Sequence, residues 1–382
     1  MQDLTLIGSG SGAALRIAGG RIAGFAARPG DLRVELGRDR LLPGLINAHD
    51  HLQLNALPRL KYRDSYRNVG EWIADIEPRL RTDPLLRANS AVPRAQRLLI
   101  GGLKNLLSGV TTVAHHDPLH AVLQEGQGFP VRVLSGYGWS HSLALDGAAA
   151  VQRAQRQTPA DQPWIIHAAE GIDAIAAAEF DALQALGCLR ANTVLVHGVA
   201  LDAAQQRRLV QAGAGLVWCP SSNLHLFGRT LDVRALIDQG CVALGSDSRI
   251  SGEQDLLAEL RVARELHGLD EASLEALVTT DAARLLRLPD RGRIEPGAQA
   301  DLLVLPAGLP LSRARRADVR LVLVGGEPRY ADPDLAAAFG AAADLLPVRV
   351  DGRPKYLARS LVQALGEAQI GEPGLELLKE WA

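Results

Sequence analysis

The sequence predicts an α/β protein: a (β/α)8 TIM-type barrel, distorted or one unit short, plus a small β-sandwich domain made from both chain ends. Between residues 45 and 287, short apolar runs typical of buried strands alternate with helical stretches, which is the pattern of a parallel α/β fold. Short strands without helices occur before and after this region. The 382 residues are enough for a barrel of ordinary size and a smaller domain.

Residues 1–42 contain strand-like runs separated by glycine turns, with Gly19-Gly20 as a hairpin signal. This segment is too small to bury a core alone, and runs of the same texture return near the other end of the chain. The first set is 4–7, 13–18 and 21–25, and the second is 293–297, 300–305 and 319–326. We therefore expect a composite sandwich of residues 1–42 and 290–345, a barrel of residues 43–289 inserted between them, and a helical C-terminal tail over 346–382.

Apolar runs place seven barrel strands. These are 45–51, 110–114, 131–134, 164–167, 193–197, 215–220 and 241–245. Helices over 93–107, 203–212 and 254–267 separate some of them, the first stopping at Gly109 and the last opened by Ser251. An eighth strand has no clear apolar run. The interval 142–163 holds a helix but little more, so we expect a distorted or missing unit there.

Composition and charge favour a soluble, cytoplasmic protein that acts on small molecules. Apolar residues make up 47% and charged residues 22%, and the formal net charge of −2 gives no field that would gather nucleic acid or an anionic membrane. The 3 cysteines are far apart, which argues against a disulfide framework or a thiolate zinc site. No secretory leader or membrane span is recognisable. Whether the chain forms a homodimer is left open.

The candidate chemistry begins at the first barrel strand, in the run PGLINAHDH (43–51). Alternate side chains of a strand share a face, so His49 and His51 should lie side by side at its carboxyl end. Two imidazoles on one face can chelate a divalent cation. A lone His-x-His is more often chance or a surface pair, so the interpretation depends on the rest of the chain.

Other ionisable residues follow the ends of later strands: His167 and Glu170, then His197, then Asp247. In a barrel the carboxyl ends of all strands face one mouth, so these residues should converge there with the first two histidines. Each has an ordinary alternative, since His197 could be a satisfied core histidine and Asp247 a helix cap. Their convergence in order favours one shared site.

These motifs resemble those of the amidohydrolase superfamily, in the branch of cytosine and guanine deaminases and triazine (chlorohydrolase-like) hydrolases. The resemblance covers about residues 1–330. It rests on PGLINAHDH (43–51), HAAE (167–170), VHG (196–198), CPSSNL (219–224), GSDS (245–248), IEPG (294–297) and ADL (300–302). Adenosine deaminases share a similar His-x-x-Glu but lack the two-ended sandwich.

The resemblance implies a mononuclear site in which His49, His51, His167 and Asp247 bind one divalent metal. Nitrogen and oxygen ligands suit zinc, and also Fe(II) or Mn(II). Dinuclear relatives bridge their metals with a carboxylated lysine or a glutamate on a middle strand. No lysine of this chain ends a core strand, which excludes the lysine version. The lysines are Lys61, Lys104, Lys355 and Lys379.

The implied catalytic residues are Glu170, His197 and Asp247. The metal acidifies a water and Asp247 accepts its proton. Glu170 delivers a proton to a ring nitrogen, and His197 polarises the attacked group or steadies the tetrahedral intermediate. The result is hydrolytic displacement at an sp² carbon, most simply C–NH₂ giving C=O and ammonia.

Residues 52–84 form a segment too long for an ordinary βα loop. Its Tyr62, Tyr66 and Trp72 are either an aromatic lid over a flat substrate or a satellite cluster that pins the loop. The candidate substrate-binding residues are Gln53, Trp72, Trp139, His141 and Asn223. The resemblance assigns no role to the run 115–117 after the second strand, and we expect its histidines and aspartate to be solvated loop residues.

The leading hypothesis is a metal-dependent aminohydrolase of a small heterocyclic substrate. One alternative is hydrolysis of a cyclic amide or another C–N or C–X bond, as in imidazolonepropionase-like or chlorohydrolase-like proteins. A catalytically inactive binding homologue is the third hypothesis. Inactive relatives usually lose metal ligands, and this sequence has lost none, which disfavours it.

Overall fold

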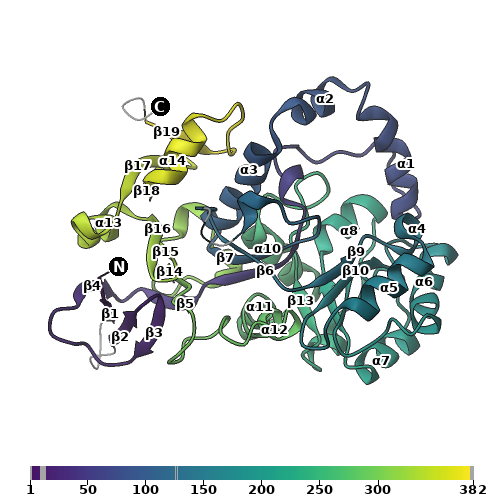
Figure 1. Cartoon of the computed structure of the whole chain (residues 1–382), viewed down its shortest axis with the longest axis horizontal. Helices are drawn as coiled ribbons and strands as arrows, with labels where there is room; N and C mark the ends of the chain where they lie inside the picture. The colour runs from purple at the N-terminus through teal and green to yellow at the C-terminus, as the bar shows by residue number, and fades with distance from the viewer. Residues whose placement is uncertain (1, 9–13, 125, 127, 379–382) are drawn as a thin grey trace.

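The computed structural model describes residues 2–8, 14–124, 126 and 128–378, and its elements fall into two regions (Figure 1). Strands from both ends of the chain lie together in one region, and parallel strands with their helices form the other. The α/β class is confirmed. Ala13, which we expected to open a strand, and Lys379 lie outside the described residues. No helix in the described part of the chain is both long and apolar enough to cross a bilayer.

The parallel strands form two sheets. One has the order β6-β7-β8 and the other the order β13-β12-β11-β10-β9. Their bounds are β6 Leu45–Asp50, β7 Val110–His115, β8 Arg132–Val133, β9 Gly138–Ser140, β10 Trp164–Ala168, β11 Thr193–His197, β12 Gly215–Trp218 and β13 Val242–Leu244. Within the described residues no ladder joins β8 to β9 or β13 to β6, so the structure does not show a closed barrel.

The strand that apolar runs did not predict is β9, and it precedes the interval in which we expected a distorted unit. Its residues Trp139 and Ser140 pair with Ile165 and Ile166 of β10. The interval 142–163 holds α4 (Leu143–Asp146) and α5 (Ala148–Gln157). The shortened unit lies between β8 and β9, where no helix intervenes. A three-residue Gly-Trp-Ser strand has no apolar run, so periodicity could not reveal it.

The expected barrel helices form with small differences at their ends. Helix α3 (Arg94–Leu107) ends before Gly109, whose φ of +83° suits glycine. Helix α7 (Ala203–Gln211) opens on a capping box. Helix α10 (Leu256–His267) is capped by Asp255 and not by Ser251, because the Asp255 carboxylate accepts from the Ala258 amide. The others here are α6 Ala174–Ala185, α8 Pro220–Phe227, α9 Arg234–Ile237, α11 Glu271–Leu277 and α12 Thr280–Leu285.

Strands from both chain ends form two further sheets. The N-terminal sheet has the order β3-β2-β1-β4 and the other the order β19-β17-β18-β16-β15-β14-β5. The bounds are β1 Leu4–Gly8, β2 Ala14–Ala18, β3 Arg21–Gly24, β4 Leu32–Gly37, β5 Arg40–Pro43, β14 Leu302–Leu305, β15 Leu321–Val324, β16 Glu327–Ala331, β17 Leu345–Val350, β18 Arg353–Ala358 and β19 Leu375–Leu377. Leu6 and Ile17 share one buried cluster with Leu302 and Leu323. The division of the chain into domains stays a prediction.

The expected helical tail is wrong over most of its length. Strands β17, β18 and β19 add to the seven-stranded sheet, and α14 (Arg359–Gly366) is the helix between them. Helix α13 (Pro333–Phe339) precedes these strands. The alternating pattern of buried and partly exposed residues in β17 is that of a strand with one covered face.

The long segment after β6 contains two helices, α1 (Val69–Arg79) and α2 (Pro84–Ala91). Tyr66 is buried with Val199, Leu226 and Phe227, and Tyr62 packs on a second small cluster. Trp72 contacts both clusters and its indole N–H donates to the Leu60 carbonyl at 3.3 Å. These aromatic residues therefore pin the loop, as the satellite-cluster alternative expects.

Candidate active site

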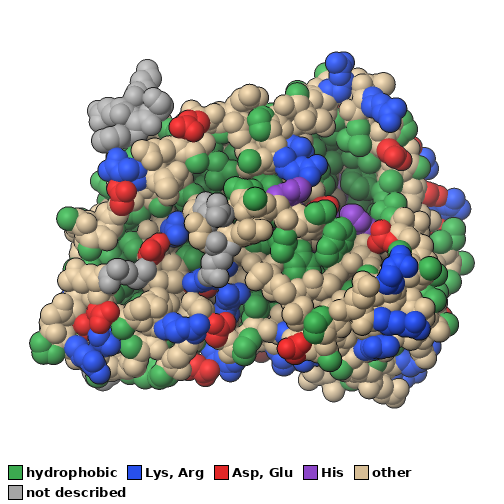
Figure 2. All heavy atoms as spheres, in the orientation of Figure 1, with side chains coloured by type: hydrophobic (Ala, Val, Ile, Leu, Met, Phe, Trp, Pro, Cys, Tyr) green, Lys and Arg blue, Asp and Glu red, His purple; other side chains and the backbone are tan. Residues whose placement is uncertain are grey.

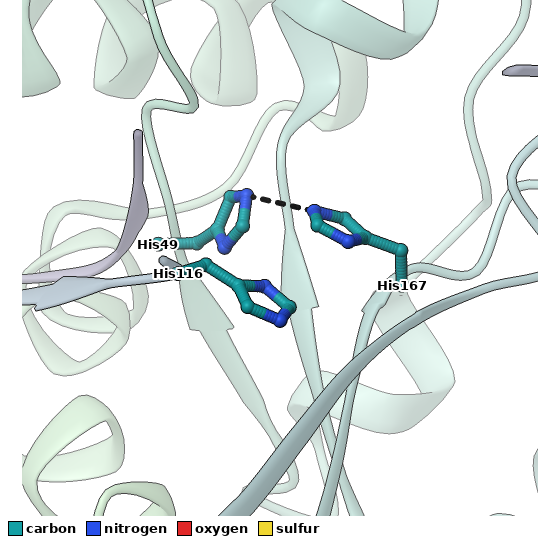
Figure 3. A group of neighbouring side chains, drawn as sticks. All are labelled: His49, His116 and His167. Carbon is teal, nitrogen blue, oxygen red and sulfur yellow. Dashed lines mark hydrogen bonds between the residues drawn. The ribbon is translucent and has the colours of Figure 1, made fainter. Parts of the chain in front are cut away.

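Three imidazoles meet where β6 and β10 end. The Nε2 atom of His167 lies 3.3 Å from Nε2 of His51 and 3.3 Å from Nε2 of His49. Figure 3 shows His49 and His167 pointing toward each other from separate elements, and Figure 2 shows histidine side chains within a hollow of the surface. The structure thus brings together the three histidines that were expected to bind the metal.

Hydrogen bonds to Nδ1 of two rings direct their Nε2 atoms into the cluster. Nδ1 of His51 lies 2.8 Å from a carboxylate oxygen of Asp117, and Nδ1 of His167 lies 2.8 Å from the carbonyl oxygen of His141. Both acceptors are satisfied by Nδ1–H, so Nε2 is the nitrogen that each ring presents to the cluster. Burial lowers the pKa of His51, but the Asp117 carboxylate outweighs it and raises the pKa to about 9, so this ring gives up its Nε2 proton when a metal binds. This donor set therefore fits a divalent metal.

Asp247 supplies a carboxylate beside these rings, 3.8 Å from Nε2 of His49. One of its oxygens accepts from the hydroxyls of Ser222 and Ser251 at 2.7 and 2.8 Å, and the other from the Ser248 amide at 2.7 Å. Burial raises the pKa of Asp247, but the neighbouring histidines and these hydroxyls outweigh it, so the net shift is downward. The group is an anion suited to a cation.

Glu170 and His197 face each other next to this cluster, with Oε1 and Nε2 3.5 Å apart. Burial raises the pKa of Glu170 well above its usual value, and the charges of Asp247 and Glu179 act in the same direction. Burial lowers the pKa of His197. The pair is therefore a neutral acid beside a neutral base, which suits proton transfer.

Backbone strain is concentrated at these positions. Ala169, His197 and Asp247 have φ values of +53°, +73° and +52°. These lie in the left-handed region, which residues other than glycine seldom adopt. Such conformations persist where the surroundings over-determine them. The Ala169 amide, for example, donates to a carboxylate oxygen of Glu179 on α6 at 2.8 Å.

Asn223 is placed differently from our expectation that it touches substrate. Its Oδ1 lies 2.9 Å from Nδ1 of His197, and its amide nitrogen donates to Thr230 at 3.1 Å. Both ends of the side chain are thus engaged inside the protein, where Asn223 fixes the tautomer of His197. Trp72, also a substrate candidate, is held in the aromatic clusters of the long loop.

The other three substrate candidates lie around Asp117. Gln53 donates to this carboxylate at 2.7 Å, and its own Oε1 is buried without a hydrogen-bond partner. The His141 ring lies 3.6 Å from Asp117, with 35% of its side chain exposed. Trp139 packs edge-on against His141, with ring centroids 4.8 Å apart. These residues form a partly open edge beside His51.

The run at the end of β7 was expected to be solvated, and this was wrong. His115 and His116 are each only 1% exposed. His116 stacks on His167, with centroids 4.2 Å apart and an angle of 8° between the rings. Nε2 of His116 lies 2.9 Å from the Ser140 carbonyl oxygen, and a ring nitrogen of His116 lies near those of His49 and His167, so these three residues also form a group that could hold a metal.

Sequence reasoning also missed Asp117, Asp50 and Lys104. Asp117 orients His51, while Asp50 and Lys104 form a fully buried ion pair with an N–O distance of 3.1 Å. One signal was available for that pair. Lys104 interrupts the apolar face of α3, and Asp50 ends the buried strand β6. Their opposite charges suggested a contact.

Glu259 on α10 holds the residue next to Ser222. Its carboxylate accepts from the Ser221 amide at 2.9 Å and from the Ser221 hydroxyl. Burial raises its pKa to about 8, despite the hydrogen bonds from Ser221. At pH values between the unfolded and folded pKa of Glu259, the folded state holds one more proton than the unfolded state. The contribution of Glu259 to the free energy of unfolding is therefore complete at low pH and is lost as pH rises toward 8.

We expect Glu259→Gln to flatten the pH dependence of stability. Between about pH 5 and 8 the free energy of unfolding of the variant should fall less steeply than that of the wild type, by about 1 kcal/mol per pH unit. Urea unfolding at several pH values measures this slope. Glu265→Gln, an exposed position on the same helix, should keep the wild-type slope. Equal slopes for all three proteins would contradict the buried-acid assignment.

A family model and individual relatives of this chain both point to amidohydrolases and deaminases. The model of the amidohydrolase family matches residues 147–329. The 5-methylthioadenosine/S-adenosylhomocysteine deaminase of Halobacterium salinarum is 29% identical over 347 residues, covering 77% of this chain and 79% of that protein. The 8-oxoguanine deaminase of Pseudomonas aeruginosa is 33% identical over 174 residues, covering 40% of this chain and 38% of that protein.

Solved structures share the fold over most of the chain. An adenosine deaminase from Xanthomonas campestris with bound zinc superposes with a TM-score of 0.69 at 21% identity, covering 89% of this chain and 97% of that one. Atrazine chlorohydrolase from Arthrobacter aurescens, complexed with zinc, gives a TM-score of 0.69 at 18% identity, covering 87% of this chain and 96% of that one. Residues 147–329, which include His167, His197 and Asp247, therefore match the amidohydrolase family, and the chain shares its fold with zinc-bound hydrolases over most of its length.

Proposed function

We propose that this protein is a metal-dependent aminohydrolase that releases ammonia from a small heterocyclic substrate. The observation that carries the proposal is the convergence of the Nε2 atoms of His51 and His49 on Nε2 of His167, each 3.3 Å away, next to the anionic Asp247. Relatives named as deaminases of methylthioadenosine, S-adenosylhomocysteine and 8-oxoguanine support the reaction class.

His49, His51, His167 and Asp247 are the proposed ligands of one divalent ion, with zinc as the preferred metal. Zinc held by these residues would supply a water whose pKa is lowered to near neutrality and would polarise the group under attack. Structural neighbours with bound zinc support the choice of metal. We further propose that β6 to β13 are the eight strands of a distorted barrel whose carboxyl ends carry this site.

The chain's own residues supply the proton transfers. Asp247, held ionised by its hydroxyl and histidine neighbours, accepts a proton from the nucleophile. Glu170 holds a proton on its carboxyl group, which burial favours, and delivers it to a ring nitrogen of the substrate. His197 is fixed by Asn223 through Nδ1 and presents Nε2 to Glu170, so it is placed to steady charge at the reacting carbon.

Gln53 is the best-placed contact for the substrate itself. Its amide nitrogen is bound to Asp117, while its Oε1 is buried and unpartnered, which is costly unless a donor arrives. An N–H group of a heterocycle is such a donor. His141 and Trp139 offer a partly exposed imidazole and an aromatic face at the same edge.

The decisive experiment is an ammonia-release screen with zinc-loaded protein over purines, pyrimidines, pterins and triazines. Purines come first, because the substrates in the names of the relatives are purine derivatives. We expect ammonia from at least one aminated heterocycle and none after the zinc is removed. Chloride or a free alkylamine without ammonia would instead identify the hydrolase alternative. A zinc-binding protein with no turnover would indicate an inactive homologue.

A further inference from the structure

Lys104 lies inside the protein next to the proposed metal site. It belongs to α3 and its side chain is 0% exposed. Its ammonium group contacts acceptors on two separate segments. On the β6 side it lies 3.1 Å from Oδ2 of Asp50 and 2.8 Å from Oδ1 of Asn55, and after β13 it lies 3.0 Å from Oγ of Ser246 and 2.8 Å from the carbonyl oxygen of Asp247.

Asp50 is the anionic partner, and its hydrogen-bonding capacity is filled. Asn105 donates to Oδ2 at 2.9 Å and Asn55 to Oδ1 at 2.8 Å. A buried ion pair is tolerated when its remaining lone pairs and protons are satisfied in this way. Neutralisation of Asp50 alone, however, does not explain why the ammonium group also reaches the segment that follows β13.

The contacts of Lys104 cross the seam at which the two parallel sheets meet without a ladder. Strand β6 carries His49 and leads into His51, while the segment after β13 carries Asp247. Across the seam the Asp247 amide donates to the His49 carbonyl at 3.1 Å, and the Ser246 amide donates to Oδ1 of Asn47 at 3.0 Å. Gly245 permits this approach, because a Cβ there would lie 2.7 Å from Cβ of His49.

The contact between Lys104 and the Asp247 carbonyl matters because the backbone of Asp247 is strained. With φ at +52°, the backbone of Asp247 needs external support. Its carbonyl oxygen accepts from Lys104, and its carboxylate accepts from Ser222 and Ser251. One end of the residue is therefore fixed by α3 and the other by hydroxyl groups beside the site, which together aim the carboxylate.

We propose that Lys104 is a positioning residue that fixes the position of Asp247 relative to His49 and His51 across this seam. The inference rests on the proposed function, because it assumes that these three residues share one metal. It assigns to the lysine a role beyond that of a counter-ion for Asp50. The metal affinity and the geometry of the ligand set should then depend on Lys104 even when the charge of Asp50 has been removed.

The test compares Lys104→Met/Asp50→Asn with Asp50→Asn alone. Both lack the carboxylate charge, and only the double variant lacks the cross-seam ammonium. Zinc affinity is measured by competition with a chelator, and ligand geometry by the visible spectrum of the cobalt(II)-loaded proteins. We expect the double variant to bind zinc about 10–100-fold more weakly than Asp50→Asn, the usual effect of losing a residue that orients a ligand, with an altered cobalt spectrum.

Lys355 provides a matched control. It is also a buried lysine, 1% exposed, but it is bound to Asp332 and to the Val319 carbonyl in the region formed by the chain ends. Lys355→Met should lower the unfolding temperature while leaving zinc affinity and the cobalt spectrum at their wild-type values. A loss of zinc affinity in this variant equal to that of the double variant would trace the effect to general destabilisation and overturn the proposal.

Equal zinc affinities and cobalt spectra for Asp50→Asn and the double variant would also overturn it, since Lys104 would then be a counter-ion alone. If the double variant does not fold, Lys104→Gln/Asp50→Asn replaces it, because glutamine also lacks the ammonium group that contacts the Asp247 carbonyl but is a polar side chain. A zinc affinity equal to that of Asp50→Asn then counts against the proposal, and weaker binding supports it. Failure of the wild-type protein to bind zinc would instead contradict the proposed function.

Discussion

Replacing Glu170 with glutamine is expected to lower turnover by about 10²–10⁴-fold, the usual contribution of a positioned general acid or base. Glutamine keeps the size of the side chain and its hydrogen bonding but cannot deliver a proton. The carboxyl group faces His197, and burial raises its pKa well above the usual value, so the wild-type residue carries a proton to deliver. Steady-state kinetics on a substrate found in the ammonia screen measures the loss.

Metal content separates the roles of the two acids. Glu170→Gln should retain zinc near the wild-type level. In the described part of the chain, the groups of side chains that could hold a metal are His49/His116/His167 and His49/His51/Asp247, and Glu170 belongs to neither. Asp247→Asn should also be nearly inactive, but with weaker zinc binding, since a charged ligand has been lost. If Glu170→Gln loses zinc, Glu170 is a ligand. Unchanged turnover in Glu170→Gln would show that no proton passes through this group.

The second large effect is expected from removing His49, which lies in β6, and His51, which follows it. The wild-type protein should hold about one zinc ion per chain, because the proposed ligands form one set. His49→Ala/His51→Ala should lose both zinc and activity, with a fall in affinity greater than the roughly 10–100-fold caused by losing a residue that only orients a ligand. Elemental analysis after dialysis gives the stoichiometry, and chelator competition gives the affinity.

His120→Ala is the control for the loss of a histidine in general. The His120 ring contacts Arg94 at the surface, 3.0 Å from Nη1, so its removal should change neither zinc content nor turnover. Two tightly held zinc ions per wild-type chain would contradict the single-metal assignment. Full occupancy in the double histidine variant would show that the metal is bound elsewhere.

Short-range patterns were enough to predict much of the fold. Apolar runs identified strands such as β10 and β11, and the helical stretches between strands identified α3 and α7, because burial demands act locally along the chain. The same reasoning failed for β9 and for β17 to β19. Those strands are defined by their pairing partners in a sheet, and their own residues carry little periodic signal.

The sequence by itself determined which ionisable residues should converge. His49, His51, His167, Glu170 and Asp247 lie at or just after the ends of apolar strands that share a direction, so the order of residues alone predicts their convergence. Only the tertiary structure decided how those groups are oriented and charged. Asp117 and the His141 carbonyl fix the tautomers of two histidines, and Lys104 joins two strands across a seam. Hydrogen bonds and electrostatic shifts depend on distances of a few ångströms between segments far apart in the chain, and local sequence does not encode such distances.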